Sequence, residues 1–175
     1  MLRHQRAGHP AAPVVTVHTC LVVRHAVALP RSGWRGDDVL RPLSHRGERQ
    51  AAALAESFSD QPVRRVLASP AGRCVATVAA IAEDAGVLVE IAPFLAEGSD
   101  GLVALRRILA AAESLERPGV VVACTHGDVL TGVVDGLVGS GAIADHPGVI
   151  PKGGAIRLVV AEGEVAAVSV VPAPD

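Results

Sequence analysis

Short apolar runs alternate along this chain with longer segments in which apolar residues recur every three or four positions. Val-rich runs predict buried β-strands at residues 16–23, 65–68, 87–91 and 120–124. Helical spacing predicts a helix after each strand: one that begins after Ser44, one from Ser69-Pro70 to about residue 84, and others over residues 102–115 and 126–138. This alternation predicts an α/β fold, a three-layer α/β/α sandwich with a mostly parallel central sheet.

The two ends of the chain lack this alternation. Residues 1–13 mix His, Arg, Gly and Pro without periodicity and predict a flexible tail, which leaves residues 14–175 as a single domain. Residues 155–160 and 165–171 are apolar and flank Glu162-Gly163-Glu164, which predicts a β-hairpin. Its outer edge fits either a dimer contact or a covered sheet edge. The oligomeric state is left open.

Composition narrows the classes of function. Half of the residues are apolar, only 2% are aromatic and the net charge is −2, which argues against a nucleic-acid partner. The apolar runs are too short to span a membrane. Cys20, Cys74 and Cys124 lack the CxxC spacing of a zinc site and are odd in number, against a disulfide framework. We expect an enzyme or a binding domain of the cytoplasm.

Chemically reactive side chains follow three of the predicted strands. Arg24 and His25 end the first strand, Ser69 to Arg73 follow the second, and His126 follows the fourth. Because ligands of open α/β sheets bind beyond the carboxyl ends of the strands, two arginines and two histidines should converge there. Arginine matches phosphate oxygens with paired N–H donors, and a neutral imidazole is a good nucleophile. The pattern therefore indicates phosphoryl transfer.

A leaving alkoxide needs a proton, so a carboxylic acid should stand near this rim. Glu97, in the loop after the third strand, is the first candidate, with Asp100 and Asp37 as alternatives. The neighbouring Asp37 and Asp38 are a poor ligand set for magnesium, and we expect no metal or other cofactor.

Four motifs carry a resemblance to a known family. They are Arg24-His25-Ala26, Leu43-Ser44-His45-Arg46-Gly47 with Gln50-Ala51, Ser69-Pro70-Ala71-Gly72-Arg73 with Thr77, and Thr125-His126-Gly127. In this order the sequence resembles the histidine phosphatase superfamily, also called phosphoglycerate-mutase-like. The resemblance runs from about residue 17 to about residue 160.

The resemblance implies a role for each matching residue. His25 would be the phosphorylated nucleophile, Arg24 and Arg73 would clamp the phosphate, and His126 would stabilise the transferring group. Glu97 lies in Leu95-Ala96-Glu97, which is similar to the family segment that carries the proton donor in many members.

Two departures from the family pattern bear on the substrate. Ala26 stands where the family usually has Gly, which looks like the branch of bacterial phosphohistidine phosphatases and Nudix-attached phosphatase domains. The segment after Ile91 is too short for the lid of phosphoglycerate mutases, and an open site favours hydrolysis over mutase chemistry.

Three further residues are weaker candidates for substrate contacts. Arg41 and Lys152 could bind substrate or be ordinary exposed cations, and Trp34 could stack on a base or anchor its loop. We therefore expect a metal-independent phosphatase that acts on phosphohistidine of a protein or on a small phosphoester. The alternatives are a nucleotide phosphohydrolase of the same fold and a catalytically silent phosphate-binding module.

Overall fold

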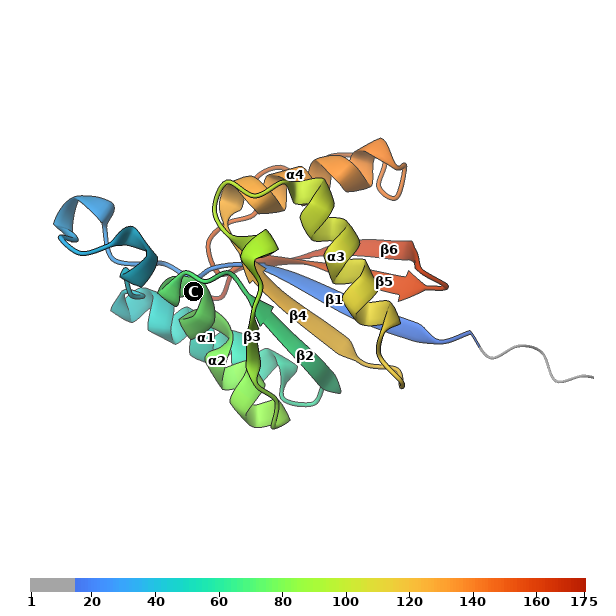
Figure 1. Ribbon diagram of the computed structural model, residues 1–175, viewed down its shortest axis with the longest axis horizontal. Helices are drawn as coiled ribbons and strands as arrows, with labels where there is room; N and C mark the ends of the chain where they lie inside the picture. Colours follow the sequence, from blue (N-terminus) through green and yellow to red (C-terminus); the bar gives the residue numbers. More distant parts are fainter. Residues whose placement is uncertain (1–14) are drawn as a thin grey trace, which may run out of the picture.

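The computed structural model describes residues 15–175 (Figure 1), so the tail expected at residues 1–13 lies outside the described residues. A six-stranded sheet has the order β3-β2-β4-β1-β5-β6. The strands are β1 (Val17–Arg24), β2 (Val63–Ala68), β3 (Val89–Ile91), β4 (Val120–Thr125), β5 (Ala155–Ala161) and β6 (Glu164–Val171). The first four pair in parallel, while β5 and β6 are antiparallel, which confirms a mostly parallel sheet.

Helices cover both faces of the sheet, as Figure 1 shows. The helices α1 (His45–Phe58) and α2 (Gly72–Ala85) pack on one face, and α3 (Gly101–Glu113) and α4 (Gly127–Gly139) pack on the other. Successive residues of β1 serve opposite faces, since Leu21 packs with α1 and α2 while Val22 packs with α3 and α4. The predicted three-layer sandwich is therefore confirmed.

The start of α2 differs from its prediction. Ser69 and Pro70 were expected to be its N-cap and first residue, but the helix begins at Gly72 with Ala71 as N-cap. The Ser69 hydroxyl is instead within hydrogen-bond distance of His126. The side chain that the sequence predicted as the helix N-cap, Ser69, thus makes a tertiary contact with His126.

Short helical turns occupy loops next to the site. The segment between β1 and α1 contains the 3₁₀ turns η1 (Arg31–Gly33) and η2 (Asp38–Leu40), and η3 (Pro93–Leu95) follows β3. The strand β3 is shorter than predicted, and it and β6 form the two edges of the sheet. Among residues 15–175, no helix has the length and apolar character needed to cross a membrane.

Candidate active site

The loops that follow β1, β2 and β4 meet at one edge of the sheet. These strands are neighbours and run in parallel, so their carboxyl ends lie together. A cavity of about 850 Å³ opens there and is lined by Arg24, His25, Arg73, Glu97 and His126. The structure thus brings together the five residues that the sequence singled out.

His25 is held as a neutral ring, and one of its nitrogens has no hydrogen-bond partner among residues 15–175. Its side chain is buried, and Nδ1 lies 2.8 Å from the carbonyl oxygen of Ala26, which can only accept a hydrogen bond. Nδ1 therefore carries the proton, and Nε2 keeps its lone pair. Burial is the main cause that lowers the pKa of His25 to about 3; the hydrogen bond to Ala26 opposes this lowering, and the nearby His126, Arg73 and Lys152 add to it. A neutral Nε2 is the state that a nucleophile needs.

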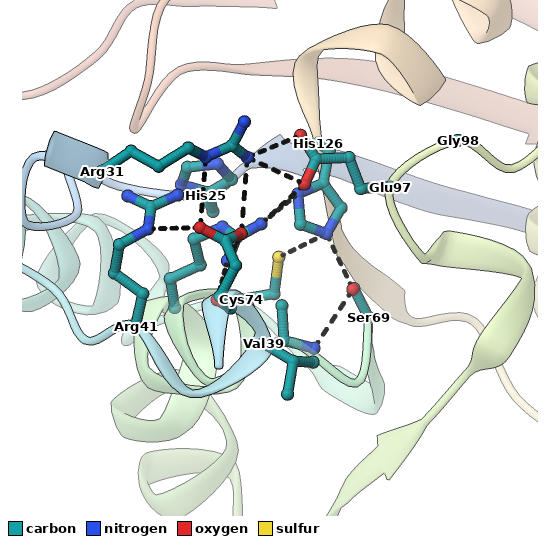
Figure 2. A network of polar contacts seen from close by, with 12 residues as sticks. His25, Arg31, Val39, Arg41, Ser69, Cys74, Glu97, Gly98 and His126 are labelled. Atoms are coloured by element: carbon teal, nitrogen blue, oxygen red, sulfur yellow. Dashed lines mark hydrogen bonds and ion pairs between the residues drawn. The ribbon is translucent and has the colours of Figure 1, made fainter. Parts of the chain in front are cut away.

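His126 is oriented by partners on both ring nitrogens (Figure 2). Arg73 Nη2, which can only donate, lies 3.4 Å from its Nδ1, so Nε2 carries the proton. Nε2 lies 2.8 Å from the hydroxyl of Ser69 and 3.5 Å from the thiol of Cys74. The His126 ring meets that of His25 edge-on, with 5.3 Å between centroids. Both imidazoles therefore face one small volume.

The two arginines of the expected clamp are anchored through backbone carbonyls. Arg24 Nη1 donates to Ile150 at 2.7 Å, and Arg73 Nη1 donates to the carbonyl of Asp38 at 2.8 Å. In both arginines the buried Nε has no hydrogen-bond partner within the described part of the chain. A Cβ on Gly127 would lie 2.9 Å from the Arg24 guanidinium, so the His126-Gly127 motif has a steric reason.

Glu97 reaches the cavity from the loop between β3 and α3. Its Oε2 accepts a hydrogen bond from Arg73 Nη2 at 2.9 Å, and Arg31 Nη2 donates to both of its oxygens. The alternatives lie elsewhere, because Asp100 caps α3 through Val103 and Asp37 caps η2. Neither alternative lines the cavity, whereas Glu97 and Asp128 do.

The three weaker candidates divide. Lys152 and Arg41 line the cavity, and Arg41 is buried, contrary to its interpretation as an exposed cation. Trp34 does not line the cavity. Its indole N–H donates to the carbonyl of Asp37 at 2.9 Å, and its ring rests against Gly36, which favours a loop anchor over a stacking platform.

Arg31 and Asp38 were missed as site residues. The Asp38 carboxylate binds three guanidinium groups, at 2.8 Å from Arg41, 3.1 Å from Arg31 and 3.2 Å from Arg73. The Arg41 hydrogen bond is the largest cause that lowers the pKa of Asp38 to about 2. The loop has no periodicity, so no sequence signal places Asp38 among arginines. Among residues 15–175, no group of three or more His, Cys, Asp or Glu side chains could hold a metal.

Supporting contacts explain other motif positions. Gln50 accepts a hydrogen bond from the Val27 amide at 3.1 Å and donates to the Lys152 carbonyl at 3.3 Å, which ties two cavity loops together. The Thr77 hydroxyl accepts from the amide of Ala26 at 3.0 Å. The Ala26 methyl is buried in a small apolar cluster, so the alanine at this position fills space beside His25.

Comparison with known proteins finds similarity both in sequence and in structure. The model of the histidine phosphatase superfamily (branch 1) matches residues 20–104. The chain is 32% identical over 164 residues to an 8-oxo-(d)GTP phosphatase of Mycolicibacterium smegmatis. That match covers 92% of this chain but 50% of the relative, so the chain spans about half the length of the curated protein.

Solved structures share the fold at low sequence identity. The protein histidine phosphatase SixA, solved with tungstate, superposes with a TM-score of 0.69 at 19% identity, over 87% of this chain and 93% of that one. A phosphoglycerate mutase from Bacillus anthracis gives a TM-score of 0.61 at 14% identity, over 91% of this chain and 93% of that one. The fold is therefore phosphoglycerate-mutase-like.

Proposed function

We propose that this chain, which belongs to branch 1 of the histidine phosphatase superfamily, is a phosphatase that works without a metal through a phosphohistidine on His25. The observation that carries this proposal is the state of His25. Its Nδ1 is fixed on a backbone carbonyl, its burial keeps the ring neutral, and its Nε2 is free beside two arginines and a second histidine. A catalytically silent module would have no need of a buried, neutral histidine at this point.

The proposed reaction has two steps. His25 Nε2 attacks phosphorus, and the bond to the leaving oxygen breaks with its electron pair on that oxygen. Arg24, Arg73 and His126 hold the oxygens of the phosphoryl group as their charge increases. Water then attacks the phosphohistidine, and the N–P electron pair returns to Nε2. Glu97 is the carboxylate that accepts the proton of this water.

The size of the cavity supports a small substrate. At about 850 Å³ the cavity is large enough for a small phosphorylated molecule to enter beside the catalytic groups. We infer a phosphorylated small molecule, with a nucleotide favoured by the likeness to an 8-oxo-(d)GTP phosphatase. Phosphohistidine on a protein, suggested by the likeness in fold to SixA, is the competing substrate. We propose a cytoplasmic location for either activity.

The test is phosphate release from 4-nitrophenyl phosphate with a chelator present. The wild type and a matched His45→Ala variant, which changes an exposed histidine, should both release phosphate, and His25→Ala should release none. A quenched reaction of the wild type should contain an acid-labile phosphoryl group on His25. Release by His25→Ala, or activity that the chelator abolishes, would contradict the proposed mechanism.

A further inference from the structure

Three cations in the cavity exceed what a single phosphoryl group needs. Arg24 and Arg73 already supply paired donors to one phosphate, yet Arg31, Arg41 and Lys152 line the same space. Lys152 lines the same cavity as the four arginines, and burial together with these guanidinium groups lowers its pKa. In a protein of net charge −2, this concentration of positive charge is local to the cavity.

Two of these cations, Arg41 and Arg31, are held in place by ion pairs. The Arg41 side chain is 8% exposed, with Nε bound to Asp38 at 2.8 Å and Nη1 bound to the Leu29 carbonyl at 2.7 Å. Arg31 binds Asp38 and Glu97, which are also the two carboxylate partners of Arg73. Only the carboxylates of Asp38 and Glu97 therefore separate Arg31 and Arg41 from Arg73; Figure 2 shows Arg31 and Arg41 beside these carboxylates.

The carboxylates only partly offset this charge. Asp38 and Glu97 pair with the arginines, and Asp128 on the cavity wall accepts a hydrogen bond from the Gly98 amide. Five cations thus face three carboxylates before any ligand binds. Asp38 compensates the buried Arg41, so the unbalanced positive charge is spread over the cavity rather than placed on that residue.

The contacts of Glu97 give a second, independent indication. Arg73 and Arg31 donate to its oxygens, an arrangement suited to an ionised carboxylate and poorly suited to a proton donor. An alkoxide leaving group needs a proton from such a donor. A phosphate leaving group does not, because its second pKa is about 6. Glu97 as bound here suits a substrate whose leaving group is itself a phosphate.

We propose that Arg31, Arg41 and Lys152 form a second anion subsite, and that the substrate is a diphosphate whose terminal phosphoanhydride bond is hydrolysed. This rests on the proposed function and names its substrate class. His25 takes the terminal phosphoryl group, and the bridging oxygen leaves with its electron pair as part of a phosphate monoester held by the second subsite. Water then releases inorganic phosphate and one proton, so a diphosphate ester and water yield a monophosphate ester, phosphate and a proton.

Inhibition by inorganic anions tests the subsite without assuming a nucleoside. Hydrolysis of 4-nitrophenyl phosphate is measured with orthophosphate and with the non-hydrolysable imidodiphosphate. We expect imidodiphosphate to inhibit at least tenfold more strongly. Arg31→Ala and Lys152→Ala, both changes of exposed side chains, should reduce that ratio severalfold. The matched control Arg35→Ala, in the same loop but outside the cavity lining, should keep it.

A comparison of two nucleotide substrates tests the same subsite through the rate of hydrolysis. Phosphate release from adenosine diphosphate should exceed that from adenosine monophosphate, and the two variants should narrow the difference. Equal inhibition by the two anions, or a ratio that survives both variants, would overturn the second subsite. The proposed function fails separately, if the wild type does not hydrolyse 4-nitrophenyl phosphate or if His25→Ala still does.

Discussion

The protonation state of His25 can be measured through stability. The change is His25→Asn, whose side-chain amide can still donate to the Ala26 carbonyl in place of Nδ1 but cannot take up a proton. Unfolding free energies of wild type and variant are compared at pH 7 and at pH 5. The quantity of interest is how much more stability the wild type loses between these two pH values.

The magnitude follows from the difference between the folded and unfolded pKa. The pKa of His25 is about 3 in the folded protein, with burial as the main cause, against 6.5 for a free imidazole. Below pH 6.5 the unfolded chain takes up a proton that the folded protein refuses, so stability falls with pH down to about 3. At pH 5 the loss is about 2 kcal/mol, and it hardly changes if the folded pKa is one unit higher.

Urea unfolding followed by circular dichroism measures this difference directly. The wild type should lose about 2 kcal/mol more than His25→Asn on going from pH 7 to pH 5. His45→Asn, a change of the exposed histidine, should follow the wild type over the same range. Equal losses in wild type and His25→Asn would mean that His25 takes up a proton as readily in the folded protein as in the unfolded chain. That result would refute the lowered pKa of His25.

Three further changes test the geometry around the cavity. Arg73→Lys removes the planar fork that binds phosphate and should lower kcat/KM for 4-nitrophenyl phosphate roughly 100-fold or more, with an unchanged circular dichroism spectrum. Gly127→Ala brings a methyl to 2.9 Å from the Arg24 guanidinium and should raise KM. Gly139→Ala, whose new methyl meets open space, should leave KM unchanged. Equal KM values for the two variants would contradict the close approach of Gly127 to Arg24. Trp34→Ala should leave kcat/KM unchanged, because the indole lies outside the cavity lining. A large loss of kcat/KM would mean that Trp34 contributes to substrate binding.

The layered fold was predictable because its signals are periodic. Val-rich runs and helical spacing gave the order of the elements, and the rule for parallel sheets placed His25, Arg73 and His126 at one edge. The start of α2 was wrong because the Ser69 hydroxyl, which accepts from the Ala71 amide, also contacts His126 across the fold, and the helix begins three residues later at Gly72. Local signals cannot report a competitor that is distant in sequence.

The role of the loop between β1 and α1 could not be predicted for the same reason. No regular spacing in the sequence connects Arg31, Asp38 and Arg41. Their role depends on ion pairs that exist only in the folded protein, where Asp38 also binds Arg73. Asp37 and Asp38 are adjacent carboxylates in the sequence, with nothing to distinguish them. In the structure Asp37 caps a 3₁₀ turn while Asp38 gathers three arginines.

Different atoms hold the two histidines, which supports the different roles proposed for them. The backbone carbonyl of Ala26 fixes Nδ1 of His25, so Nε2 is left with a lone pair toward the cavity. The Ser69 hydroxyl is bonded to Nε2 of His126, so Nδ1 faces Arg73 and the incoming phosphate. In the proposed mechanism a phosphate oxygen takes the place of the Arg73 contact at Nδ1, while Ser69 keeps its contact with Nε2. One ring would thereby act as the nucleophile and the other as a contact of the transferring phosphoryl group.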